Sequence, residues 1–170
     1  MITSLVMDKA RPIRLVLTDC DGVLTDGGVY YSERGEELKR FLIRDGMGVE
    51  RLKKLADVET GIVTGELSPS VKRRAEKLGI EECHLGVKDK AALVQSIAAR
   101  RGIPLSAIAY IGDDVNDLEA FSLVGLSACP QDAFEAVKER VDLVCCLKGG
   151  EGAFRELAEV IVAAHTGTAC

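Results

Sequence analysis

The hydrophobic pattern of this chain alternates short, fully apolar runs with longer amphipathic ones. Runs of the first kind are typical of strands buried on both faces of a sheet. They cover Arg14–Thr18, Thr60–Val63, Ala107–Ile111, Gly125–Ala128 and Val141–Val144. The spacing between them predicts helices over Gly46–Leu55, Pro69–Leu78, Lys88–Arg101, Asn116–Leu123, Ala133–Lys138 and Gly152–Ala164. This order predicts an α/β fold with a Rossmann-like open parallel sheet and helices on both faces.

One insertion interrupts that rhythm after the first strand. Gly28–Ser32 and Glu37–Leu42 flank the sequence ERG, which predicts a β-hairpin over about residues 27–42. Only 45 positions separate Asp19 from Thr64, and the hairpin and one helix use them, so a cap domain has no room there. We therefore expect a single domain over residues 1–170, with a short flexible tail from about 166 to 170.

Polar residues follow the apolar runs at three strand ends. They are Asp19 and Asp21, Thr64 and Gly65, and Asp113 and Asp114, and Lys90 opens a predicted helix. Ligands of open α/β sheets bind beyond the carboxyl ends of the strands, so these side chains are expected to share one crevice. Clustered carboxylates there favour Mg²⁺, which prefers oxygen ligands.

Two other readings of the acidic cluster fit less well. An EF-hand loop starting at Asp19 would place Val23 at its fifth position, where an oxygen ligand is needed, and a GxGxxG fingerprint is absent. Phosphoryl transfer explains the set better. A carboxylate can attack phosphorus, a second can act as general acid and base, and a cation and a lysine can hold the phosphoryl oxygens.

Four segments, DCDGVLTDG, IVTGE, KDK and GDDVND, resemble the motifs of the haloacid dehalogenase-like phosphatases, in the family's order. The resemblance implies that Asp19 is the nucleophile and Asp21 the general acid/base. It also implies that Thr64 and Lys90 bind phosphate. The implied Mg²⁺ ligands are Asp19, the backbone carbonyl of Asp21, and Asp113, which Asp114 supports.

Further stretches, among them TDGGVYYSERGEELKRF and GGEGAFRE, resemble the capless branch that dephosphorylates 2-keto-3-deoxy sugar acids. That branch acts on 3-deoxy-D-manno-octulosonate 8-phosphate (KDO 8-phosphate) or on the 9-phosphate of the nine-carbon acid KDN. The resemblance implies a homotetramer whose hairpins associate and whose neighbouring subunits help to close each site.

The residues expected to contact the substrate sugar favour the nine-carbon acid. Glu66, which follows Gly65 in TGE, resembles the KDN 9-phosphate pattern together with Arg74 and Lys77, which lie on one helix face. Arg44 in RDG resembles the octulosonate enzymes instead, and Arg155 is a candidate for the substrate carboxylate. A KDN 9-phosphate or related nonulosonate phosphatase is therefore expected, with a KDO 8-phosphate phosphatase as the alternative.

Composition restricts the other function classes. The net charge is −5 without a basic block, which argues against nucleic acid or an anionic membrane as a partner. No apolar run reaches the roughly 20 residues of a membrane span, and we expect a cytoplasmic protein. A non-catalytic tetramerisation domain of the kind attached to sugar-acid cytidylyltransferases is the rival of a different class.

Overall fold

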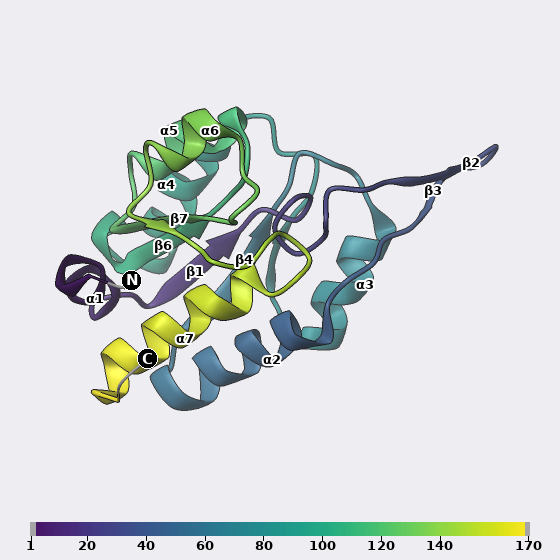
Figure 1. Ribbon diagram of the computed structural model, residues 1–170. Coiled ribbons are helices and arrows are strands. Elements are labelled where there is room, and N and C mark those ends of the chain that lie inside the picture. Colours follow the sequence, from purple (N-terminus) through teal and green to yellow (C-terminus); the bar gives the residue numbers. More distant parts are fainter. Residues whose placement is uncertain (1–2, 169–170) are drawn as a thin grey trace.

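The computed structural model describes residues 3–168, and its centre is a six-stranded sheet in which every strand pairs in parallel with its neighbours. The strand order is β5-β4-β1-β6-β7-β8. Figure 1 labels β4, β1, β6 and β7 of this sheet. The strands are β1 (Leu15–Thr18), β4 (Glu59–Val63), β5 (Glu82–His84), β6 (Ile108–Ile111), β7 (Leu126–Cys129) and β8 (Leu143–Val144). β1 lies between β4 and β6, where the strand order reverses, and a crevice at its carboxyl end follows from that reversal.

Helices cover both faces of the sheet, as the sequence predicts. On one face lie α1 (Ser4–Ala10), α2 (Ile43–Arg51) with a π-helical turn (Leu52–Ala56), α3 (Pro69–Leu78) and α7 (Ala153–Thr166). On the other lie α4 (Lys90–Arg101), α5 (Leu118–Phe121) and α6 (Glu135–Lys138). Turns of 3₁₀-helix span Leu105–Ala107 and Val115–Asp117.

Strand alternation divides the core into two parts. Leu15 and Leu17 of β1 pack toward α4, whereas Val16 between them packs toward α7. Because both faces of the strand are buried, every residue of β1 has to be compatible with the interior, and the strand reads as an unbroken apolar run apart from Thr18.

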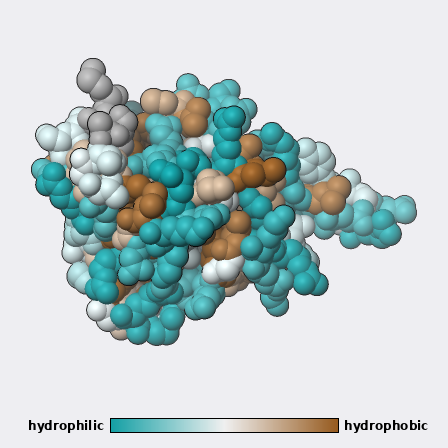
Figure 2. All heavy atoms as spheres, turned by 90° about the horizontal axis from the view of Figure 1, so that it is seen from below, coloured by the Kyte–Doolittle hydropathy of each residue, from teal (hydrophilic) through white to brown (hydrophobic). Residues whose placement is uncertain are grey.

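The hairpin consists of β2 (Tyr30–Ser32) and β3 (Gly35–Leu38), which pair antiparallel around a turn at residues 33–34. It is shorter than predicted and projects from the body of the molecule (Figures 1 and 2). Gly35 has φ +99°, a conformation that favours glycine. Residues 3–168 contain no second folded unit over the crevice, which agrees with the expected absence of a cap.

Two helices differ from the sequence prediction. The helix α1 was not expected, because its seven residues are too few to show a clear period; Thr3 caps it and Lys9 pairs with Asp142 at 2.5 Å. α7 continues to Thr166, so the helix includes the first residue of the expected flexible tail, whose last two residues, 169–170, lie outside the described residues. None of the helices in residues 3–168 is long and apolar enough to cross a membrane.

Candidate active site

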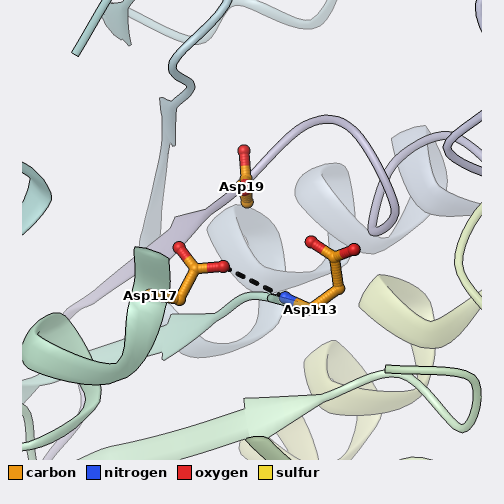
Figure 3. Close-up of side chains that lie close together, drawn as sticks. All are labelled: Asp19, Asp113 and Asp117. Carbon is orange, nitrogen blue, oxygen red and sulfur yellow. Dashed lines mark hydrogen bonds between the residues drawn. The ribbon is translucent and has the colours of Figure 1, made fainter. Parts of the chain in front are cut away.

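Three carboxylates meet at the carboxyl ends of β1 and β6 (Figure 3). Asp19 follows β1, Asp113 follows β6, and Asp117 ends the 3₁₀ turn after Asp113. β1 and β6 are adjacent strands, with Thr18 paired to Ile111, which brings the two acidic segments together. One oxygen from each of the three side chains lies within 4.8 Å of the others.

Lys90 completes this group from a distant part of the chain. Asp89 caps α4 by accepting a hydrogen bond from the Ala92 backbone at 2.8 Å, so the helix begins at Lys90. The Lys90 ammonium, 3% exposed, donates to Asp19 Oδ2 at 2.6 Å and to Asp117 Oδ1 at 2.7 Å. The structure therefore joins the lysine and the aspartate that the sequence assigns to one phosphate site.

Burial and charge act in opposite directions on this cluster. Burial lowers the pKa of Lys90, but attraction to Asp19 and Asp117 raises it by more, so the ammonium stays charged. Burial, followed by repulsion from Asp117, raises the pKa of Asp19 to about 6 despite Lys90. Burial and the carboxylates of Asp19, Asp117 and Asp114 raise that of Asp113 to about 7. The excess negative charge is the environment that a divalent cation would stabilise.

Asp117 is a site residue that the sequence analysis missed. It is fully buried, and its carboxylate accepts hydrogen bonds from Lys90, from the Tyr110 hydroxyl at 2.8 Å, and from the backbone N–H groups of Asp113 and Asp114. Asp117 therefore positions both Lys90 and the 113–114 backbone. The third acidic residue of GDDVND was the available signal, but the sequence does not show that the turn points it inward.

Two glycines make the acidic cluster possible. A Cβ atom on Gly112 would lie 2.3 Å from Asp117 Oδ2, and one on Gly22 would lie 2.0 Å from Asp113 Oδ2. Any larger residue would collide with the carboxylates at both positions. The glycines in DCDG and in GDD thus let the backbone approach the acidic side chains closely.

Asp114 does not join the cluster as expected. It is exposed, and its side chain accepts a hydrogen bond from the Val115 backbone at 2.7 Å as the cap of the 3₁₀ turn. Its short side chain is used locally, as is common for aspartate at a helix start. The structure thus gives Asp114 a capping role, and its expected support of the metal stays a prediction.

Thr64, Gly65 and Glu66 lie at the same edge of the sheet, after β4, the neighbour of β1. Thr64 is buried, and its hydroxyl oxygen accepts a hydrogen bond from the Glu66 backbone at 3.2 Å. The Glu66 side chain is exposed. This placement agrees with a phosphate-binding Thr64 and leaves Glu66 accessible to a ligand.

Asp21 lies beside the hairpin. Its Oδ1 accepts a hydrogen bond from the Lys39 ammonium at 2.5 Å, whereas Oδ2 is buried without a hydrogen-bond partner among the described residues. Burial lowers the pKa of Lys39, and hydrogen bonds and attraction to Asp21 and Glu36 raise it by more. Lys39 is a second residue near the reacting groups that the sequence analysis did not single out.

Comparison with known proteins agrees with this geometry. Residues 83–154 match the family described as haloacid dehalogenase-like hydrolase. The 3-deoxy-D-manno-octulosonate 8-phosphate phosphatase of Haemophilus influenzae is 40% identical over 160 residues, which are 94% of this chain and 88% of that protein. The chain belongs to the haloacid dehalogenase-like hydrolases.

Solved structures of the same branch superpose closely on this hydrolase. The Yersinia pestis octulosonate phosphatase has a TM-score of 0.94 at 36% identity, covering 97% of this chain and 89% of that one. The Moraxella catarrhalis enzyme, solved with magnesium, phosphate and KDO, has a TM-score of 0.93 at 36% identity and covers 98% and 95% of the two chains. The expectations of a capless phosphatase branch and a phosphoric monoester hydrolase are confirmed.

Two expected substrate contacts of this hydrolase are placed elsewhere. Arg74 donates to the Leu42 carbonyl at 2.9 Å and lies over the Phe41 ring, with 5.6 Å between its Cζ and the ring centroid. Lys77 borders a cavity of about 390 Å³ that is also lined by Glu59, at the amino end of β4. Because α3 runs antiparallel to the strands, its last turn lies at the edge of the sheet opposite Asp19 of the same subunit, and a substrate contact by Lys77 stays a prediction.

Arg44 and Arg155 also lie apart from the acidic cluster. Both line an open cavity of about 820 Å³ beside α2 and α7. The Arg155 guanidinium donates to Glu159 at 2.6 Å, and its backbone N–H donates to Asp45 Oδ1 at 3.0 Å. Arg155 thus links α7 to α2 in the subunit described here. Among residues 3–168, no contact with the phosphate site supports substrate binding by Arg44 or by Arg155.

The glycine-rich loop before α7 supports the turn after β1. Gly150 donates a backbone hydrogen bond to the Val23 carbonyl at 2.9 Å. A Cβ on Gly149 would lie 1.9 Å from the Gly22 carbonyl oxygen, so the two backbones are in direct contact. The loop therefore holds the segment that carries Asp19 and Asp21 in place.

Proposed function

We propose that this protein is a Mg²⁺-dependent phosphatase that hydrolyses the terminal phosphate of KDO 8-phosphate. The observation that carries the proposal is the Lys90–Asp19 contact of 2.6 Å at the carboxyl end of β1, in a chain 40% identical to an octulosonate phosphatase. A nucleophilic carboxylate next to a buried ammonium is suited to attack on a phosphate ester.

Mg²⁺ fits the residues that surround this crevice. Asp117 already accepts hydrogen bonds at both of its oxygens, whereas no side-chain hydrogen bond of the Asp113 carboxylate is found among residues 3–168. Asp19, Asp113 and the backbone carbonyl of Asp21 would hold the ion. When bound, it would neutralise phosphoryl oxygens as charge shifts in the transition state. The magnesium in the Moraxella catarrhalis structure supports this choice.

The residues of the chain divide the reaction into two steps. An Asp19 oxygen attacks phosphorus, the P–O bond to the sugar breaks, and Asp21 donates a proton to the leaving alkoxide. Asp21 then accepts a proton from water, whose oxygen attacks the aspartyl-phosphate, and the bond from Asp19 to phosphorus breaks. Lys90 and Thr64 hold the phosphoryl oxygens, and inorganic phosphate and the free sugar acid leave.

The comparisons favour the eight-carbon substrate over the nine-carbon one that the sequence analysis preferred. The Haemophilus influenzae relative and the two structures compared above all carry the octulosonate 8-phosphate activity in their names. Arg74 and Lys77 were two of the residues behind the KDN 9-phosphate preference. Arg74 donates a hydrogen bond to the Leu42 carbonyl, and Lys77 lies at the edge of the sheet opposite Asp19. Glu66 alone remains at the crevice edge.

A side-by-side assay tests the substrate. Release of phosphate from KDO 8-phosphate, KDN 9-phosphate and N-acetylneuraminate 9-phosphate is measured with Mg²⁺, and the highest kcat/KM is expected for KDO 8-phosphate. A preference for a nine-carbon acid would overturn the substrate assignment. A folded protein that binds Mg²⁺ but hydrolyses none of the three would favour the non-catalytic tetramerisation role.

The nucleophile is tested by Asp19→Asn. The amide cannot form the aspartyl-phosphate, so we expect a loss of at least ~10⁴-fold in kcat with an unchanged far-UV circular dichroism spectrum. Asp8→Asn is the matched control, because Asp8 pairs with Arg11 on the surface, and this variant should keep full activity. A fully active Asp19→Asn variant would exclude Asp19 as the nucleophile.

We also propose the homotetramer that the family resemblance implies. The hairpin supports it, because a two-stranded hairpin is marginally stable alone and this one exposes Val29, Tyr30, Tyr31 and Leu38 by at least half of their surface. Its association with other subunits would cover these side chains and place a neighbour beside each open crevice.

A further inference from the structure

Lys39 reaches the turn after β1 from the foot of the hairpin. It follows β3 directly, and its side chain is 0% exposed although the strand before it lies on the surface. A fully covered lysine needs anionic partners, since burying an unpaired charge is costly. Its partners are Asp21 Oδ1 at 2.5 Å and Glu36 Oε2 at 3.3 Å.

Lys39 leaves one oxygen of Asp21 free. The Oδ2 atom is buried and has no hydrogen-bond partner among the residues described, whereas Oδ1 is held by the ammonium. A buried carboxylate oxygen without a donor is unusual in a folded protein and indicates a position that a ligand fills. Oδ1 of Asp21 is thus anchored by Lys39, whereas Oδ2 lacks a donor.

The anchor is itself fixed to the body of the molecule. Glu36 Oε1 accepts a hydrogen bond from the Ser68 hydroxyl at 2.7 Å, and Ser68 is the buried residue that precedes α3. Lys39 is therefore held between the hairpin, the start of α3 and the turn after β1. This arrangement restricts the side-chain torsions of Lys39 and, through it, of Asp21.

We infer that Lys39 is a positioning residue for the proton transfer by Asp21. It holds Oδ1 so that Oδ2 faces the oxygen of the leaving group, and it couples the position of the hairpin to this step. The inference rests on the proposed function, in which Asp21 protonates the leaving alkoxide. Proton transfer by a positioned acid contributes about 10²–10⁴-fold to the rate, and part of that is expected to depend on the anchor.

The test compares a poor with a good leaving group. KDO 8-phosphate releases an alkoxide that needs the proton, whereas 4-nitrophenyl phosphate releases a stable phenolate that does not. The kcat/KM value reports only the steps through formation of the aspartyl-phosphate, so the later activation of water does not enter it. For Lys39→Ala we expect a drop of ~10–100-fold with KDO 8-phosphate and of about threefold or less with 4-nitrophenyl phosphate.

Two further lysine variants and a neighbouring control separate positioning from damage to the fold. Lys39→Arg can keep the charge-assisted hydrogen bond and should recover most of the loss, and Lys39→Gln, of similar length, should show the same dependence on the leaving group as Lys39→Ala. Arg40→Ala removes the adjacent, half-exposed charge of the hairpin, whose distance to Asp26 is 3.7 Å. This variant should leave kcat/KM unchanged for both substrates. Equal losses with both substrates for the two neutral lysine variants, or no loss, would overturn the inference.

Asp21→Asn distinguishes a failure of this inference from a failure of the proposed function. If Asp21 is the general acid, this variant loses far more activity with KDO 8-phosphate than with 4-nitrophenyl phosphate. A uniform loss would reject the acid role of Asp21, and the role of Lys39 with it. A loss that depends on the leaving group in Asp21→Asn but not in Lys39→Ala and Lys39→Gln would reject the Lys39 role alone.

Discussion

At the scale of single residues, the molecule treats its buried carboxylates in contrasting ways. Asp117 accepts four hydrogen bonds, one of them from a buried ammonium, so its charge is well compensated. Asp45 accepts one from the Arg155 backbone, and its other oxygen is buried without a partner among the described residues. Burial therefore raises the pKa of Asp45 to about 6, against the hydrogen bond from Arg155 and the charges of Arg74 and Arg155.

Asp45 should make the stability of the protein depend on pH. The folded state binds the proton of the Asp45 carboxyl more tightly than the unfolded chain does. The stabilisation that this proton gives is therefore complete below about pH 4 and is lost as the pH rises to about 6. A change of pKa from 3.8 to about 6 corresponds to ~3 kcal/mol as an upper limit. Asp45→Asn should therefore gain stability relative to the wild type between pH 4 and pH 7, measured by urea unfolding at each pH.

The control for this prediction is Asp57→Asn. The Asp57 side chain is 91% exposed, and the same isosteric change there should leave the pH profile unchanged. Other carboxyls with raised pKa values, such as Asp19 and Asp113, contribute equally to all three proteins and cancel in the difference. A stability difference between wild type and Asp45→Asn that stays constant from pH 4 to pH 7 would contradict the assignment.

At the scale of elements, the ends of helices and strands place the chemistry. The Asp89 cap starts α4 where Lys90 can turn toward Asp19, and the loop of residues 148–152 presses against the turn after β1. Gly150 has φ +67°, and a Cβ there would lie 2.5 Å from the Asp26 backbone nitrogen. The glycine is thus required both for the backbone conformation and for the contact.

Gly150→Ala should therefore displace the turn that carries Asp19 and Asp21. Gly102→Ala is a matched control, because Gly102 has φ +63° at the end of α4 and an added Cβ would meet nothing within 4 Å. The control should lose only the ~1–2 kcal/mol of unfolding free energy that the left-handed conformation costs an alanine. For Gly150→Ala we expect a larger loss of stability and a fall in kcat of ~10-fold or more. Equal kcat and equal unfolding free energy in the two variants would contradict a supporting role of this loop.

At the scale of the whole molecule, the packing within one subunit does not explain the exposed apolar side chains of the hairpin. It projects away from the sheet and exposes Tyr31 by 71% and Leu38 by 66% of their surface. Apolar side chains gathered on a projecting element are typical of an interface between protein chains. The crevice beside it has no cap among the described residues, and a neighbouring subunit would restrict its access to water.

The assembly is tested by charged substitutions on the hairpin. Light scattering after size-exclusion chromatography should give a tetramer for the wild type and a smaller species for Tyr31→Asp and Leu38→Asp, since an interface cannot bury an unpaired carboxylate cheaply. The smaller species should also have a higher KM, because each crevice loses its neighbour. Leu5→Asp on α1, 63% exposed and outside the hairpin, is the control. A monomeric wild type would contradict the proposed assembly.

The sequence determined those features that depend on local pattern and order. Apolar runs identified most of the central strands, and the placement of Asp19, Thr64, Lys90 and Asp113 after strands or at a helix start predicted their shared crevice. This follows because parallel strands of a sheet end at one edge. The length between motifs also left no room for a cap.

Only the tertiary structure decided which polar side chains face that crevice. Asp117 points into it, Lys39 pairs with Asp21 beside it, and Lys77 lies at the opposite edge, because the direction of a side chain depends on turn geometry and on the packing of neighbouring elements. Asp114 is used as a cap and Arg155 as a link between α7 and α2, and in sequence both look like ligands of a site. Contacts between residues far apart in the chain, such as Lys39 with Asp21, arise only when the hairpin and the turn after β1 are both folded.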